Sequence, residues 1–299
     1  MGSWQARAFS IGMRIFMRRR TWGDAQTLAR RARRVFGAPR AFQWARSRDV
    51  RIEPVRDGAV GGEWIIPERS GAGTILYFHG GGYVACSPAT HRPITAGLAR
   101  RARRRVFSAD YRRAPEHRFP AALDDAIATY RWLLDQRIEP RAIVVAGDSA
   151  GGGLALATLV RARDEALPLP ARAVCFSPWT DLTATAESLR LNDGRCALFR
   201  PRTIEEFAAA YLGDGSPKHP YASPLFAELG GLPPVLLQVA STELLLDDAR
   251  RVHERIGRAG GVSRLEIFDG VFHGWHMLDG LVPEAGRALD QAAAFMTER

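Results

Sequence analysis

One serine of this chain lies in a pattern that can turn a hydroxyl group into a nucleophile. Ser149 is the centre of Gly-Asp-Ser-Ala-Gly at residues 147–151, which fits the motif G-x-S-x-G. The apolar run before it (142–146) predicts a buried strand, and the segment after it (152–160) predicts a helix. A sharp turn between them needs small neighbours and places Ser149 at a helix N-terminus, where the helix dipole favours a developing anion. The alternative is a glycine-rich turn whose serine only faces solvent.

A second motif, His-Gly-Gly-Gly at residues 79–82, directly follows an apolar run that predicts a strand. Consecutive glycines keep backbone N–H groups clear of side chains. Two of these groups, together with the N–H of Ala150, would make a three-donor hole for a tetrahedral oxyanion, and one such donor typically contributes about 3–4 kcal/mol to catalysis. A phosphate-binding loop is the alternative, but neither a P-loop pattern nor a dinucleotide fingerprint follows the glycines. We expect His79 to brace the loop.

A serine nucleophile needs a base, and position in the chain sorts the seven histidines. His273 and His276 follow the late predicted strand at 264–268. In enzymes with this serine motif, the histidine lies in a loop beyond a late strand. We favour His273 and keep His276 as the alternative. The others are expected in loops near prolines or in the middle of a helix: His91, His117, His219 and His253.

The acid that orients the histidine should leave the predicted strand at 235–240. Glu243 is the first carboxylate after that strand, where the sheet edge would face the site. Asp247 and Asp248 come one turn into the next helix, where an acidic pair more often caps the helix or forms salt bridges. Because the fold accepts either Asp or Glu in this role, Glu243 is our first choice and Asp247 stays open.

The elements that must position these groups are strands that alternate with helices, which predicts a mostly parallel eight-stranded sheet covered on both faces. Two regions depart from this alternation: residues 1–48, which look helical, and residues 178–234, which contain a predicted helix at 203–212. We therefore expect a catalytic domain at 49–299, N-terminal cap helices at 1–48 and a cap insertion at about 178–234. The predicted strands are 50–55, 63–66, 74–79, 105–110, 142–147, 172–177, 235–240 and 264–268, and the other predicted helices are 89–104, 120–137, 150–165, 244–259 and 283–298.

The composition is that of an ordinary globular protein, with 46% hydrophobic and 25% charged residues among 299. No apolar run approaches the ~18 residues of a membrane-spanning helix, and arginines interrupt any leading hydrophobic segment, so we expect no secretory signal. Three widely spaced cysteines exclude a disulfide framework and a zinc spacing. We expect a cytoplasmic protein without a metal or a cofactor.

The formal net charge of +10 is concentrated at one end of the chain. Residues 1–50 hold twelve arginines and two aspartates, which leaves 30 basic and 30 acidic residues in the remainder. We therefore expect no nucleic-acid partner. Trp4, Ala8, Ile11 and Ile15 share one face of the first predicted helix, with arginines on another. The arm either packs on its own domain or makes a peripheral contact with a membrane surface, possibilities that the sequence leaves open.

At this point the chain resembles the hormone-sensitive-lipase-like branch of the α/β-hydrolases, the bacterial family IV carboxylesterases, from about residue 50 to the C-terminus. The resemblance implies an α/β-hydrolase fold with a helical cap, Ser149 as nucleophile, His273 as base, and oxyanion donors at Gly81, Gly82 and Ala150. It also makes a homodimer plausible. The motifs that carry it are residues 79–82 (HGGG), 110–122 (DYRRAPEHRFPAA), 147–152 (GDSAGG), 177–179 (SPW), 222–225 (ASPL) and 269–273 (DGVFH).

One departure concerns the acid. The family commonly has Asp-Pro-Leu-x-Asp, whereas this chain has Glu-Leu-Leu-Leu-Asp at residues 243–247. A glutamate can still reach the imidazole if the backbone draws back slightly, so Glu243 remains our choice. Support for the site is expected from His79, Gly80, Asp148 and Asp247.

Together these observations predict a serine carboxylesterase that hydrolyses small esters of short to medium acyl chains through an acyl-enzyme intermediate. The chain-length range comes from the family resemblance. Three alternatives stay open: an amidase or deacetylase with the same triad, a membrane-surface lipid esterase that uses the basic N-terminal arm, and a ligand-binding receptor on the same fold. The receptor reading is disfavoured because the branch of the family that binds ligands lacks the histidine that is present here at residue 273.

Overall fold

Eight strands form one sheet in the computed structural model, which describes residues 2–298. Their order across the sheet is β1-β2-β4-β3-β5-β6-β7-β8. The pairs from β4 to β8 are parallel, while β1 and β2 pair antiparallel at one edge. All eight strands that the sequence predicts are therefore confirmed, with small shifts at their ends. The strands are β1 (Val50–Asp57), β2 (Val60–Pro67), β3 (Thr74–Phe78), β4 (Arg105–Ala109), β5 (Ile143–Asp148), β6 (Arg172–Phe176), β7 (Val235–Ala240) and β8 (Ser263–Phe268).

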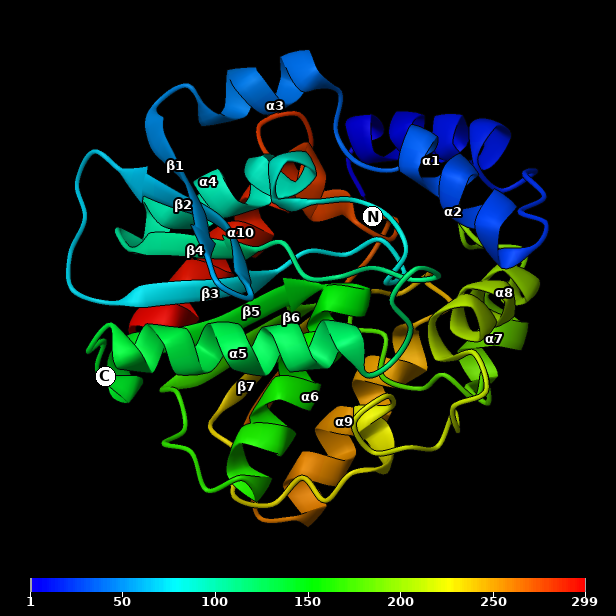
Figure 1. The fold of residues 1–299 in the computed structure, drawn as a ribbon. Helices are drawn as coiled ribbons and strands as arrows, with labels where there is room; N and C mark the ends of the chain where they lie inside the picture. The colour runs from blue at the N-terminus through cyan, green and yellow to red at the C-terminus, as the bar shows by residue number, and fades with distance from the viewer. Residues whose placement is uncertain (1, 299) are drawn as a thin grey trace.

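Helices cover both faces of this sheet (Figure 1). On one face α4 (Arg92–Ala102) packs with α10 (Pro283–Thr297), and on the other lie α5 (Ala121–Asp135), α6 (Ala150–Asp164) and α9 (Leu246–Arg258). Two hydrophobic clusters result, because successive side chains of a strand point to opposite faces. In β3, for example, Leu76 and Phe78 belong to one cluster, and Ile75 and Tyr77 belong to the other.

Four of the remaining helices form a cap. Figure 1 shows α1 (Trp4–Phe16) and α2 (Ala25–Val35) on the same side of the molecule as α7 (Glu187–Leu191) and α8 (Pro201–Leu212). The rings of Trp22 and Phe36 lie 5.5 and 5.8 Å from the ring of Phe207, so the N-terminal segment and the later insertion share an aromatic core.

The third N-terminal helix, α3 (Arg40–Ser47), packs against α4 rather than against α8. Residues 1–48 thus contain two helices on the cap and one on the catalytic domain. The boundaries 1–48 and 178–234 stay predictions. The short α7 is a helix that the periodicity of the sequence did not indicate.

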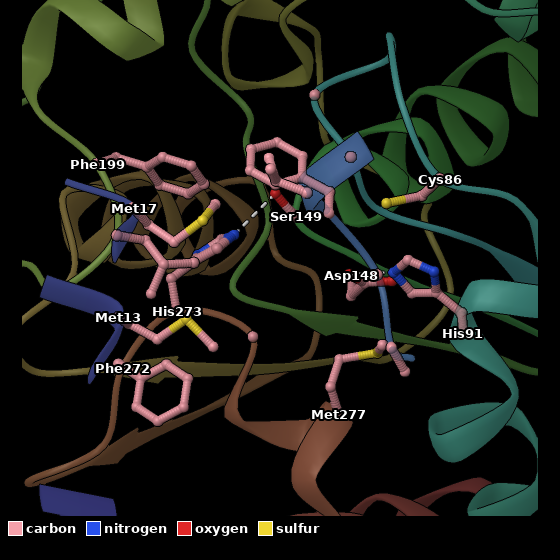
Figure 2. Close-up of a pocket in the computed structure, with 18 of the residues that line it drawn as sticks. Met13, Met17, Cys86, His91, Asp148, Ser149, Phe199, Phe272, His273 and Met277 are labelled. Carbon is pink, nitrogen blue, oxygen red and sulfur yellow. Dashed lines mark hydrogen bonds and ion pairs between the residues drawn. The ribbon is translucent and has the colours of Figure 1, made fainter. Parts of the chain in front are cut away.

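Helix α1 has two apolar faces. Phe9, Met13 and Met17 point inward and line the cavity described below, as Figure 2 shows for the two methionines. The face that the sequence identifies, with Trp4 and Ile11, is the opposite one, and it is exposed to solvent.

Candidate active site

Ser149 occupies a strained turn between β5, which ends at Asp148, and α6, which begins at Ala150. Its φ of 54° and ψ of −122° lie where non-glycine residues rarely occur, and such strain is typical of functional positions. The turn also requires glycine next to the serine. A Cβ atom at Gly151 would lie 2.0 Å from the carbonyl oxygen of Phe78. The strand–turn–helix context predicted around the motif is therefore present.

His273 lies beside this serine. It follows β8 in the chain, and its Nε2 is 2.9 Å from the Oγ of Ser149 (Figure 2). The ring is mostly buried and makes an edge-on contact with Phe199 of the cap, at 5.3 Å between centroids. His276, the alternative base, is directed into the core instead, where its Nε2 is 3.2 Å from the Oε1 of Gln238.

Glu243 completes a continuous line of hydrogen bonds. Its Oε2 is 2.5 Å from the Nδ1 of His273. Its other oxygen, Oε1, accepts hydrogen bonds from the hydroxyl of Ser177 at 2.6 Å and from the backbone N–H of Ala240 at 2.7 Å. Glu243 is only 1% exposed, so these three partners hold a buried carboxylate in one orientation. A buried charge needs such partners to be tolerated.

The other two carboxylates of this region point away from His273. Asp247 accepts a hydrogen bond from the backbone N–H of Ser188 at 2.7 Å. Asp248 accepts from the backbone N–H groups of Thr180 and Asp181 at 2.7 and 2.9 Å. Both aspartates therefore tie the start of α9 to the segment that follows β6.

The glycine loop is joined to the nucleophile turn by Asp148. The Oδ1 of Asp148 accepts hydrogen bonds from the backbone N–H of Gly80 at 2.9 Å and from the hydroxyl of Tyr77 at 2.7 Å. Burial raises the pKa of Asp148, but nearby His91 and these hydrogen bonds outweigh burial and lower the pKa to about 2. The carboxylate is therefore ionised at neutral pH and fixes the loop against the turn. Gly81 and Gly82 line the same cavity as Ser149.

His79 lies beneath the loop. Its ring stacks on Tyr111 at 4.3 Å, and its Nδ1 is 2.7 Å from the carbonyl oxygen of Gly80. The hydroxyl of Tyr111 donates to the carbonyl of His79 at 2.6 Å. These contacts are consistent with the expected bracing role.

Sequence reasoning missed His91, which it placed among loop histidines. In the structure its Nε2 is 3.2 Å from the Oδ2 of Asp148, and it lines the cavity (Figure 2). The pairing depends on how the start of α4 packs on the nucleophile turn, two segments that are 57 residues apart in the chain. No local pattern in the sequence carries that information.

A cavity of about 430 Å³ adjoins Ser149. Its walls are almost entirely apolar and come from the catalytic domain and from the cap, including α1. Beyond the residues already described, Val35, Phe36, Phe42, Phe207, Phe272, Met277, Leu278 and Leu281 line it. A hydrocarbon chain fits such a lining, because apolar surface is removed from water on both partners.

The lowered pKa values of two buried histidines predict how the stability of the fold depends on pH. Burial lowers the pKa of His79 and of His276 to about 3, against about 6.5 in an unfolded chain. Only the unfolded state then binds these protons between pH 6.5 and 3, so stability is present above pH 6.5 and is lost as the pH falls. From pH 7 to 5 each histidine should cost about 2 kcal/mol of the free energy of unfolding.

Urea unfolding at pH 7 and pH 5 measures this loss, and His276→Gln should remove about 2 kcal/mol of the pH-dependent change. A variant and a wild type that lose equal stability between the two pH values would contradict the assignment. Any general cost of the substitution appears equally at both pH values and cancels in the comparison.

Residues 2–298 contain no cluster of His, Cys, Asp and Glu that could hold a metal ion. Over the same residues, every helix is too short or too polar to cross a membrane.

Comparisons with known proteins show the family to which the chain belongs. Residues 75–277 match a family model described as α/β hydrolase fold. An acetyl-hydrolase of Streptomyces hygroscopicus is 44% identical over 234 residues, which are 78% of this chain and 78% of that protein. An esterase of Acinetobacter venetianus is 39% identical, over 83% of this chain and 82% of its own length.

Solved structures extend the similarity to nearly the whole chain. An esterase/lipase from an uncultured bacterium superimposes with a TM-score of 0.90 at 38% identity, covering 98% of each chain. An esterase from the bacterial hormone-sensitive lipase family has a TM-score of 0.89 at 38% identity, covering 99% of this chain and 98% of that chain. The chain therefore belongs to the α/β-hydrolase family, in its hormone-sensitive-lipase-like branch of carboxylic ester hydrolases.

Proposed function

We propose that this protein hydrolyses carboxylic esters of short to medium acyl chains through an acyl-enzyme intermediate on Ser149. The observation that carries the proposal is the unbroken line of hydrogen bonds from Ser149 through His273 to Glu243, with contacts of 2.9 and 2.5 Å. In this arrangement His273 acts as the base, and Glu243 selects its tautomer and stabilises the imidazolium.

The reaction follows from these positions. His273 takes the proton of Ser149 as Oγ attacks the ester carbonyl, and the resulting oxyanion accepts hydrogen bonds from the N–H groups of Gly81, Gly82 and Ala150. When the intermediate collapses, His273 gives the proton to the departing alcohol. A water molecule, activated by the same histidine, then attacks the acyl-enzyme and releases the acid.

The proposed range of acyl chains is supported by the cavity and by the relatives. A cavity of about 430 Å³ with apolar walls takes a hydrocarbon chain of modest length. One relative carries the name acetyl-hydrolase, and the similar esterase EstE5 was crystallised and soaked with p-nitrophenyl butyrate. These acyl groups of two and four carbons lie at the short end of the proposed range.

A series of p-nitrophenyl esters from acetate to dodecanoate tests the proposal, with p-nitroacetanilide as the matched amide. We expect kcat/KM to peak between two and eight acyl carbons and the anilide to be turned over at least a thousandfold more slowly than the acetate ester. An optimum at dodecanoate would contradict the chain-length range. Equal rates on the ester and the anilide would favour the amidase that the sequence left open.

A further inference from the structure

The outer surface of α1 carries large apolar side chains that nothing in the fold covers. Trp4, Ile11, Ile15 and Phe16 are 74%, 61%, 53% and 70% exposed. The first three share one helix face, because they are separated by seven and four residues. Single exposed apolar residues are common on soluble proteins, but a group of this size on one helix marks an interaction surface.

Arginines accompany this apolar group, and we call the apolar side chains and these arginines together the outer α1 face. Arg7 and Arg14 are exposed on the same stretch of helix, and Arg19 and Arg20 follow directly after it. Arg14 donates to the carbonyl of Arg195 and Arg20 to that of Phe16, contacts that leave their positive charge in place. The net charge of the first 50 residues equals the net charge of the whole protein, and five of the twelve arginines in that segment lie within residues 1–20.

The opposite side of α1 lines the cavity that adjoins Ser149. Phe9, Met13 and Met17 line that cavity together with Ser149 and His273. Helix α1 therefore separates the cavity from the outer α1 face by the thickness of a single helix. Whatever binds the outer α1 face lies next to the place where an apolar substrate is held.

We propose that the outer α1 face docks on an anionic phospholipid surface. Indole and aliphatic side chains enter the boundary between headgroups and acyl chains, while arginines at the same depth pair with lipid phosphates. Each basic residue near such a surface strengthens binding about fivefold.

The combination of apolar and basic side chains disfavours two other partners for the outer α1 face, a second copy of this chain and a nucleic acid. In a two-fold interface between copies of this chain, each arginine of the outer α1 face would approach the positive face of its partner, which opposes association. A nucleic acid would neutralise the arginines but would leave Ile11, Ile15 and Phe16 in water.

Sedimentation with vesicles tests the proposal on the full chain. All proteins carry Ser149→Ala, so the lipids stay intact and the result does not depend on the proposed catalytic mechanism. We expect binding to vesicles of phosphatidylcholine with 30% phosphatidylglycerol, at least tenfold weaker binding to phosphatidylcholine alone, and a steep loss as NaCl rises from 0.05 to 0.5 M.

Two sets of variants locate the contact. Ile11→Ser with Ile15→Ser should weaken binding at least tenfold, and Arg14→Gln, Arg19→Gln and Arg20→Gln together should weaken it about a hundredfold. The controls are Val262→Ser, which alters a side chain that is 64% exposed beyond α9, and Arg56→Gln with Arg141→Gln and Arg258→Gln, which remove three exposed charges elsewhere. These controls should bind like the parent protein.

Several results would overturn the proposal. One is an affinity for the anionic vesicles no higher than that for phosphatidylcholine alone. Another is equal loss in the control variants, which would make the attraction a general effect of charge. A third is a dimer in solution that Ile11→Ser with Ile15→Ser dissociates, without vesicle binding, since a second copy would then cover the face. Thermal melts of every variant show whether the fold is retained, and the arginine set keeps the test valid if the serine set does not fold.

Discussion

Replacing Ser149 with alanine should lower kcat for p-nitrophenyl acetate by about 10⁵- to 10⁶-fold, the loss typical of a serine hydrolase without its nucleophile. The remaining groups would still bind the ester and hold its oxyanion, but no acyl-enzyme could form. The substitution removes only an oxygen atom from a turn that Gly151 and the packing of α6 define. We therefore expect the melting temperature to change by no more than a few degrees.

Initial rates and a thermal melt of the same preparation check this result. Ser70→Ala is the matched control, because Ser70 is exposed and makes only a weak contact, at 3.4 Å, with the carbonyl of Gly71. It should keep full activity. If Ser149→Ala retained more than a tenth of the wild-type kcat, Ser149 would not be the nucleophile and the mechanism would be wrong.

The strands were predictable because their apolar runs are short, bounded by turn residues and separated by helical periodicity. β3, β5 and β7 are buried throughout, as expected for parallel strands covered on both faces. The order of the strands was not predictable in the same way. β1 and β2 form a local hairpin, but the antiparallel pairing of β2 with β4 depends on contacts between distant segments, which periodicity does not report.

The candidate site was predictable where a motif fixes the local backbone. Ser149 and the glycine loop directly follow the end of a strand, and His273 lies in the loop after β8, so their places in the chain determine the sheet edge they reach. His91 was missed because its partner Asp148 is supplied by packing of α4 against the nucleophile turn. A histidine near a proline looks the same whether it is buried or exposed.

The inward face of α1 was not recognised for a different reason. The period of 3.6 residues identifies an apolar face but does not say which partner covers it, and α1 has two such faces. Sequence reasoning identified the one with Trp4 and Ile11. The structure places Phe9 and Met13 against the cavity instead.

Glu243→Gln should reduce kcat by about 10³- to 10⁴-fold, whereas Asp247→Asn should change it less than threefold. Both substitutions exchange a carboxylate for an amide of the same size. Glutamine at position 243 could still accept from Ser177 and Ala240, but the group that faces His273 would be neutral. It would no longer stabilise the imidazolium, and its N–H₂ group would favour the wrong tautomer.

Asp247→Asn should retain the hydrogen bond from Ser188 and lose only the charge of a long ion pair with Arg250, at 3.4 Å. The amide oxygen of asparagine can still accept from the backbone N–H of Ser188. Its effect should therefore fall on stability, by about 1 kcal/mol or less, the usual range for a capping hydrogen bond. Rates and urea unfolding of both variants distinguish the acid of the triad from a carboxylate that only stabilises the fold. A loss of kcat larger for Asp247→Asn than for Glu243→Gln would mean that Asp247 is the acid.

Glu243→Asp tests whether the site depends on the length of the glutamate side chain, since the family commonly has aspartate at this position. The Oε1 atom of Glu243 is held by Ser177 and Ala240 while Oε2 meets His273, so the length of the side chain spans two fixed positions. An aspartate is one methylene shorter and has to give up one of these positions. If it keeps Ser177 and Ala240, it draws away from His273, and kcat should fall at least tenfold with little change in KM. A variant with wild-type kcat would mean that the backbone after β7 moves freely, and the fixed geometry argued for Glu243 would be wrong.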